Sequence, residues 1–255
     1  MPEHEIWLTR LFNDHLAGLG SWVLSLANAN AENPARPWAN FVTMQLLVAA
    51  IILVLFAVLR PRLSMDRPGT LQHVLEVIYS FLHSESRDNI GHEGPRFLPF
   101  VGTLFIFILF CNLIGIIPGF ESPTQTPSVP AGCAVLVFVY YNFMGFKQQG
   151  IFRYLAHFAG PVWWLAPFMI PIEIISHLAR PLSLTIRLFA NMMAGHTMLK
   201  VFGGFVVALG ILGGWAPLAF VVALTGLEIG IAFLQAYVFT ILTCIYLNDA
   251  IHVHH

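Results

Sequence analysis

The chain has 255 residues, of which 57% are hydrophobic and only 10% are charged. Soluble domains carry about one quarter charged residues, so this composition indicates a protein whose main solvent is lipid. The formal net charge is −1, and no basic patch predicts nucleic-acid binding. The three cysteines, Cys111, Cys133 and Cys244, lie far apart in apolar runs without metal-ligand spacing, so we interpret them as small core residues.

The chain opens on MPEHEIWLTRLFNDHLAGLGSW, which is acidic and has no short apolar core followed by a small-residue cleavage site. This is not typical of a cleaved signal peptide, nor is it the Arg- and Ser-rich pattern of a transit sequence. We therefore expect the first long apolar run to direct membrane insertion, and residues 1–40 to form an outside N-terminal segment.

Three apolar runs in the first part of the chain are predicted to be membrane spans. They cover residues 41–59, 97–117 and 131–146. The segment TLQHVLEVIYSFLHSES between the first two has apolar residues at helical spacing but is too polar to cross a bilayer. Residues 71–86 are therefore predicted to form an amphipathic helix at the membrane surface.

Charge in the connecting segments predicts the orientation of these spans. One side of the arrangement carries the basic residues Arg60, Arg62, Arg67, Arg87, Arg96, Lys147 and Arg153. The loop FESPTQTPSVP on the other side carries Glu121 and no Lys or Arg. By the positive-inside rule the basic side is cytoplasmic, or faces the matrix or stroma in an organelle, and the N-terminus is outside.

The last part of the chain does not divide into ordinary spans. Residues 164–209 are interrupted only by single prolines, and a helix of that length measures about 68 Å against a bilayer core of about 30 Å. We interpret this segment as a tilted or curved helix. GILGGWAP, residues 210–217, is typical of a turn, and residues 218–248 are predicted to form a second long helix. The predicted fold is all-α: one polytopic membrane domain of about five membrane-embedded helices and an amphipathic surface helix, ending in a long tilted antiparallel hairpin.

Folding this hairpin about a turn centred near Ile211 aligns the polar residues of its two helices. The register gives three facing pairs: Arg187 with Gln235, His196 within a turn of Glu228, and Glu173 with Asp249.

Helical geometry places the polar residues of the first helix around Arg187. Ser183, Arg187 and Asn191 share one stripe, and Glu173 falls within about 40° of it. His196 lies roughly half a turn round from Arg187. The His196–Glu228 group and the Glu173 group are therefore predicted at opposite ends of the pair, which is the layout of two aqueous paths divided by a cation.

Other interpretations apply to several of these residues. A lone His196 in an apolar helix is more often an interior residue than a proton carrier, whereas an intramembrane acid such as Glu228 is usually functional. Arg180 and Lys200 could extend toward the membrane interfaces. The C-terminal HVHH resembles a metal clamp, but terminal histidines are more often solvated, and no HExxH, Walker loop, GxSxG or CxxC pair occurs. We predict no metal site and no cofactor.

One segment of the first hairpin helix, PLSLTIRLFANMMAGH, closely resembles the most distinctive segment of the subunit a family of F-type ATP synthases. The resemblance extends to CNLIGIIPG in the second predicted span, to PFMIPIEIIS before the arginine, and to LEIGIAFLQAYVFTILTCIYL at the end. Several specific motifs thus occur in the same order, while the first forty residues lie outside the resemblance.

The resemblance implies a role for individual residues. Arg187 matches the essential stator arginine that faces the ring carboxylate, and Asn191 and Gln235 match its polar neighbours. His196 and Glu228 match the acid–histidine pair of the outer half-channel. Glu173 matches an acid of the inner half-channel, and Ser183 matches a small polar residue beside the path. Some members carry an Asp where this chain has Gly115, so no proton-relay role is expected there.

The same resemblance implies a non-catalytic membrane subunit that passes protons to and from c-ring carboxylates and so couples proton flow to rotation and ATP synthesis. Its expected partners are the c-subunit ring, the peripheral stalk subunit b, the remaining F1Fo subunits and membrane lipid. The expected location is a bacterial plasma (inner) membrane, with an organelle inner membrane as the alternative. A secondary transporter with its own substrate is the competing interpretation, but transporters usually show paired repeats and none is found here. An intramembrane enzyme would need a nucleophile or metal set that the sequence lacks.

Overall fold

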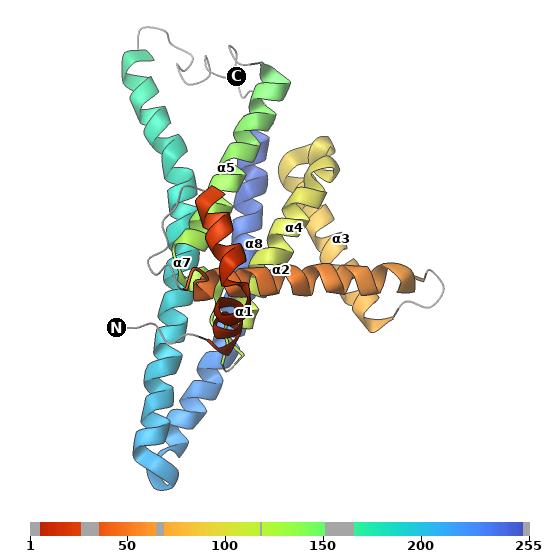
Figure 1. Ribbon diagram of the computed structural model, residues 1–255. Coiled ribbons are helices and arrows are strands. Elements are labelled where there is room, and N and C mark those ends of the chain that lie inside the picture. Colours follow the sequence, from red (N-terminus) through yellow and green to blue (C-terminus); the bar gives the residue numbers. More distant parts are fainter. Residues whose placement is uncertain (1–5, 27–35, 65–68, 118, 151–165, 252–255) are drawn as a thin grey trace.

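The computed structural model describes residues 6–26, 36–64, 69–117, 119–150 and 166–251, and over these ranges the secondary structure is all-α (Figure 1). The long helices are α1 (Trp7–Leu26), α2 (Asn40–Leu59), α3 (Thr70–Ile90), α4 (Gly94–Ile114), α5 (Ser128–Gln149), α7 (Ala166–Gly213) and α8 (Trp215–Ile251). Short 3-10 turns are η1 (Arg60–Arg62), η2 (Gly91–Glu93) and η3 (Pro123–Gln125). With α3 and α4 taken as one stretch, 5 described helical segments are long and apolar enough to cross a membrane, which confirms the predicted fold class.

The core forms where the central helices meet. Helix α4 packs against α3 and α8, and α5 packs against α7 and α8. The largest fully buried side chains there are Phe97, Phe105, Ile108, Tyr141, Leu184, Leu188, Phe239 and Leu247. Buried positions on α7 recur at every fourth residue through Leu184, Leu188, Met192 and His196, as expected when one face of a helix packs against its neighbours.

Helices α7 and α8 form the hairpin that the sequence predicts. Helix α7 has 48 residues, and the backbone angles inside it depart from helical values only at Gly210, where φ is 60° and ψ is −160°. Glycine adopts this left-handed region without strain, and a Cβ at the nearby Gly214 would lie 2.6 Å from the Gly210 carbonyl oxygen. The two glycines therefore allow the tight reversal, while Pro171 and Pro181 lie inside α7 without ending it. The helix measures about 72 Å, more than twice the thickness of a bilayer core.

Helix α2 leaves the bundle and runs crosswise to the hairpin in Figure 1. Its first half is held by protein, because Val48 packs with Cys111 and Ile114 of α4 and the Thr43 hydroxyl lies 2.7 Å from that of Thr9. Its second half exposes apolar side chains. A helix of 20 residues spans about 30 Å, so α2 has the length and surface of a single lipid-crossing helix.

Helix α1 lies in the N-terminal segment, for which the sequence analysis predicted no helix. It has a non-helical residue at Leu16, whose carbonyl accepts a hydrogen bond from Trp38 Nε1 over 2.8 Å, and Asn13 ties it further to the chain before α2. Asn13 Nδ2 donates to the Trp38 carbonyl over 3.2 Å, and the Trp38 amide donates to Asn13 Oδ1 over 3.0 Å. These contacts depend on residues distant in sequence, which local periodicity does not reveal.

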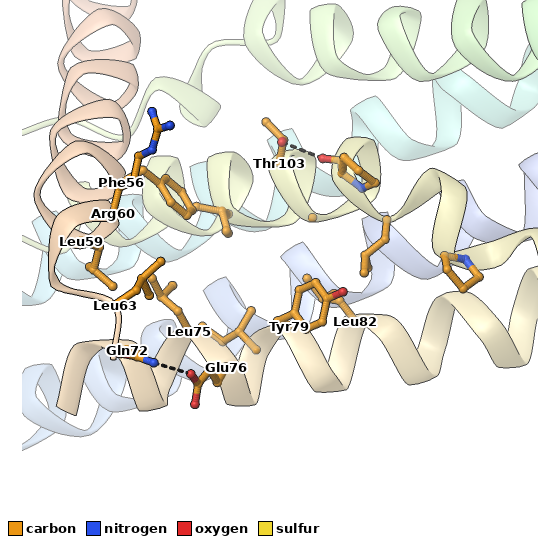
Figure 2. Close-up of a pocket in the computed structure, with 16 residues that line it drawn as sticks. Phe56, Leu59, Arg60, Leu63, Gln72, Leu75, Glu76, Tyr79, Leu82 and Thr103 are labelled. Carbon is orange, nitrogen blue, oxygen red and sulfur yellow. Dashed lines mark hydrogen bonds between the residues drawn. The ribbon is translucent and has the colours of Figure 1, made fainter. Parts of the chain in front are cut away.

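An apolar pocket of about 590 Å³ lies in the corner formed by α2, α3 and α4 (Figure 2). Phe56, Leu63 and Leu75 line it, with Arg60 at the end of α2. Gln72 closes the turn from α2 to α3 by bonding both the amide and the carbonyl of Ser64. The apolar side of the predicted amphipathic helix thus faces α4, and its Leu82 is buried in the core.

The described contacts place the connecting segments at two ends of the molecule. At one end, Gln148 Nε2 donates to Glu93 over 2.6 Å and Gln149 Nε2 donates to the Ala250 carbonyl over 2.8 Å. This joins the basic ends of α3, α4 and α5 to the end of α8, and we call it the basic end. At the other end, Asn40 at the start of α2 bonds Glu121 over 3.5 Å. We call this the Glu121 end.

Candidate functional site

Near the Glu121 end, two ionisable side chains of the hairpin are buried side by side. His196 of α7 is 7% exposed and Glu228 of α8 is 4% exposed. His196 Nδ1 lies 3.8 Å from Glu228 Oε1. The predicted pairing of these two residues is therefore present in the structure. Burying such groups away from water is unfavourable unless they interact, so the pair is a functional candidate.

Two glycines provide the space for this pair. A Cβ at Gly195 would lie 2.5 Å from Glu228 Oε1, and a Cβ at Gly115 would lie 2.7 Å from both Cε1 and Nε2 of His196. Gly115 thus lies directly against the ring, at a position where no proton-relay role was expected. Any larger residue at either position would displace one member of the pair.

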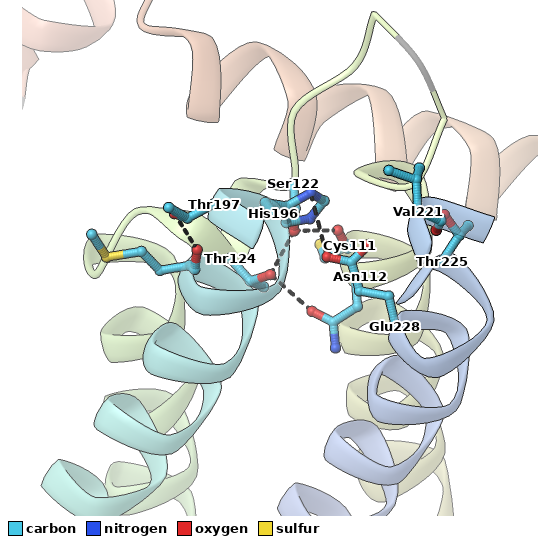
Figure 3. A network of polar contacts seen from close by, with 10 residues as sticks. Cys111, Asn112, Ser122, Thr124, His196, Thr197, Val221, Thr225 and Glu228 are labelled. Atoms are coloured by element: carbon cyan, nitrogen blue, oxygen red, sulfur yellow. Dashed lines mark hydrogen bonds and ion pairs between the residues drawn. The ribbon is translucent and has the colours of Figure 1, made fainter. Parts of the chain in front are cut away.

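A chain of hydrogen bonds lies beside the pair and leads toward the Glu121 loop (Figure 3). The Ser122 hydroxyl donates to the Cys111 carbonyl over 2.8 Å and lies 2.6 Å from the Thr124 hydroxyl. Thr124 donates to Asn112 Oδ1 over 2.8 Å, and Asn112 Nδ2 donates to the Ala232 carbonyl over 3.4 Å. The sequence analysis missed Asn112, Ser122 and Thr124, because the last two read as loop residues. An asparagine inside the apolar run CNLIGIIPG was the one available signal.

Several buried polar atoms here make no hydrogen bond within the described part of the chain. They are His196 Nε2, both carboxylate oxygens of Glu228, and Gln235 Nε2. Buried polar groups are normally paired, so such atoms gathered around two ionisable residues need an explanation. These atoms therefore mark the surroundings of His196 and Glu228 as a candidate functional site.

Arg187 lies on a different face of α7, which is exposed. Ser183, Ala190 and Asn191 share this face and are exposed as well. Asn191 Nδ2 donates to Gln235 Oε1 over 3.0 Å. The sequence predicted that Gln235 faces Arg187, and Asn191 lies one helical turn from Arg187. Arg187 and Ser183 make no hydrogen bond or ion pair with any described residue. A guanidinium on an apolar hairpin of this kind needs a compensating partner, and the described residues do not provide one.

Toward the basic end, one predicted pair is wrong. Asp249 Oδ2 lies 3.3 Å from Arg180 Nη2, so the residue opposite Asp249 is Arg180 and not Glu173. The register of the hairpin drifts along its length. The long side chain of Arg180, seven residues after Glu173 on α7, therefore reaches Asp249. Glu173 is half-buried and forms no ion pair with the described residues. The HVHH segment lies outside the described residues.

Replacing Gly195 with alanine is expected to displace the Glu228 carboxylate. For the proton-carrying role that the resemblance implies, we expect proton flux to fall about tenfold, because overpacking costs about 1–3 kcal/mol. Gly203→Ala is the matched control, since it lies on the same helix with nothing within 4 Å of its Cβ position. Both changes raise helix propensity equally, so a comparison of flux in vesicles isolates the steric effect. Equal flux in the two variants would show that the close approach at Gly195 has no functional consequence.

The fold and the site define a class of protein: a multi-pass integral membrane protein with ionisable groups toward both ends of one helical hairpin and an exposed arginine between them. The chain belongs to the ATP synthase A chain family, whose family model matches residues 42–248. It is 58% identical over 245 residues to the ATP synthase subunit a of Solibacter usitatus, covering 96% of this chain and 100% of that relative.

Other bacterial relatives agree in kind. The ATP synthase subunit a of Koribacter versatilis is 41% identical over 250 residues, or 98% of each chain. The one of Acidiphilium cryptum is 46% identical over 234 residues, or 88% of this chain and 92% of the relative. The resemblance stated from the motifs is thereby confirmed at the level of the family.

Proposed function

We propose that the chain is the proton-translocating stator subunit of an F-type ATP synthase, a membrane subunit that is not catalytic by itself. The observation that carries this proposal is the setting of Arg187, an exposed cation on the hairpin. The hairpin buries a histidine–glutamate pair toward the Glu121 end, and it carries Arg180, Asp249 and Glu173 toward the basic end. In this proposal the residues act within the whole complex, beside a c-subunit ring and the stalk subunit b, and the family membership supports that setting.

Protons enter from the Glu121 end. Asn112, Ser122 and Thr124 provide a hydrogen-bonded route toward His196 and Glu228. Histidine can exchange a proton near neutral pH, and the Glu228 carboxylate beside it is a second group that can carry one. From this pair the proton passes to a carboxylate of the ring, which can then move into lipid without carrying a charge.

Arg187 separates this path from the second one. Its guanidinium stays protonated, so it repels protons in transit and attracts the ionised ring carboxylate before that group is reloaded. Asn191 and Gln235, bonded to each other beside it, keep polar surface next to the passing carboxylate. The returning carboxylic acid releases its proton toward Glu173 at the basic end, which the positive-inside rule places in the cytoplasm.

The orientation of α2 supports a tilted hairpin. Its length of about 30 Å matches a bilayer core when the helix stands along the membrane normal. Helix α7 runs crosswise to α2, so α7 then lies strongly inclined to the normal (Figure 1). This accommodates a helix of 48 residues. A bacterial plasma (inner) membrane is the proposed location.

A cysteine at Ala190 is expected to form a disulfide with a cysteine placed next to the acid of a c-subunit, because Ala190 lies on the exposed face of Arg187. The native cysteines are buried and do not compete. Val139→Cys on α5, where the native side chain is 60% exposed, is the control and is expected to give no such product. The measurement is the cross-linked band in assembled membranes. Cross-linking through position 139 alone would place the ring on another face, and isolation of the chain without any small acidic partner would favour a transporter.

A further inference from the structure

We propose that His177 is a proton-transfer group on the release path, placed between Arg187 and Glu173 near the basic end. This inference rests on the proposed function and adds a residue to it. His177 was not a candidate in the sequence analysis, because it lies outside the stripe that Arg187 defines.

A hydrogen bond determines which nitrogen of the neutral His177 ring carries the hydrogen. Asn142 Nδ2 donates to the Phe138 carbonyl over 2.7 Å, which orients the Asn142 amide and turns its Oδ1 toward His177. That oxygen lies 3.0 Å from His177 Nε2 and can only accept, so Nε2 carries the hydrogen. The Tyr141 oxygen lies 3.3 Å from the same nitrogen. In the neutral ring, Nδ1 therefore holds the lone pair that can accept a proton.

The surroundings hold the ring in place without fixing its charge. Phe138 and Tyr141 contact it edge-on, with ring centroids 5.1 Å and 5.3 Å away. Arg180, one turn away on α7, is already paired with Asp249 at 3.3 Å and stacks on Tyr246 at 5.0 Å. The pairing with Asp249 offsets part of the Arg180 charge near His177.

The position along α7 suits a relay. His177 lies ten residues from Arg187, or about 15 Å along the helix, and one turn from Glu173. Gln149, which follows Asn142 by two turns on α5, bonds the Ala250 carbonyl, so this cluster adjoins the basic end.

The step is a simple proton transfer. A protonated ring carboxylate that has passed Arg187 gives its proton to His177 Nδ1, directly or through water, and becomes a carboxylate. The imidazolium then passes this proton on to the Glu173 carboxylate, which releases it to water on the basic side. No other bond changes, and His177 ends each cycle neutral.

The test compares two kinds of replacement, measured as passive proton flux through the F1-stripped membrane sector in vesicles. His177→Gln keeps an N–H that can donate to Asn142 Oδ1 but has no titratable base. We expect it to assemble normally and to lower the flux about tenfold. This loss is smaller than the roughly 10²–10⁴-fold typical of a lost acid–base group, because water substitutes in part for the missing imidazole. His73→Gln, on the exposed surface of α3, is the matched control and is expected to leave flux unchanged.

Two further measurements separate proton transfer from a purely structural tie between α5 and α7. Flux through the wild-type chain is expected to vary with the pH of the basic-side compartment, and His177→Gln is expected to lose the part of this dependence that His177 contributes. Among the described residues, Tyr141 on α5 lies 3.3 Å from the ring, and Glu173 and Arg180 each lie one turn away on α7, where Arg180 contacts Asp249 and Tyr246 of α8. All of these groups are kept in the variant. In His177→Ala, added imidazole is expected to restore flux.

Wild-type flux in His177→Gln would overturn the proposal, as would unchanged pH dependence together with no rescue by imidazole. Either result leaves the role of Arg187 untouched, because loss of synthesis on neutralising Arg187 tests the proposed function separately.

Discussion

Replacing Arg187 with alanine is expected to abolish ATP synthesis driven by a proton gradient, while passive proton leak through the membrane sector persists or increases. Arg187 is an exposed cation of the hairpin and has no ion-pair partner among the described residues, so in the proposed mechanism its charge is available to the ring carboxylate. Alanine removes the attraction that holds this carboxylate at the loading point. It also removes the charge that keeps protons from passing between the two paths. The two losses have separate signatures in the same vesicles.

Arg187→Lys is the stricter form of this test. Lysine keeps a positive charge but offers a compact ammonium group, which can lose its proton when desolvated, whereas a guanidinium cannot. We expect lysine to fail in synthesis as well, because a stator charge that releases its proton becomes a shunt. Synthesis and leak are measured side by side in reconstituted vesicles. Normal synthesis in the alanine variant would remove Arg187 from the mechanism and contradict the proposed function.

Exchanging His196 and Glu228 is expected to recover more proton flux than the two single replacements predict. His196 Nδ1 lies 3.8 Å from Glu228 Oε1, and both side chains are buried, so removing one leaves the other as a buried group without its partner. The double exchange restores one acid and one imidazole at the same place. Residues in contact typically couple by about 0.5–3 kcal/mol, well above the error of additivity for distant sites.

The exchange has a steric limit that sets its expected size. Gly195 and Gly115 provide clearance for a carboxylate on α8 and a ring on α7, and the exchanged side chains differ in shape. Recovery is therefore expected to be partial. The measurement is a double-mutant cycle on proton flux at equal amounts of assembled complex. A double variant that is no better than additive would show that the two residues act independently.

The sequence predicted features that follow from helix length and local chemistry. A segment too long to span upright, followed by glycines, predicted the hairpin and its turn, and the same register placed His196 near Glu228. The Glu173–Asp249 pair was wrong because a register counted from the turn accumulates error with distance, and because Arg180 reaches further than an acid. Helix α1 and the Asn112–Thr124 contact were missed because both depend on residues brought together only by the fold. His177 was missed for the same reason, since its partners Tyr141 and Asn142 lie on another helix.

Because α7 is continuous, it sets the distances between the functional residues that it carries. His196, Arg187, His177 and Glu173 all project from one helix that keeps its regular turn up to Gly210, so their spacings are set by the rise of the backbone alone. From Glu173 to His196 this is about 35 Å. One added or lost residue would turn everything beyond it by about 100° and carry His196 away from Glu228. Between these positions the chain can therefore vary in its side chains but not in its length.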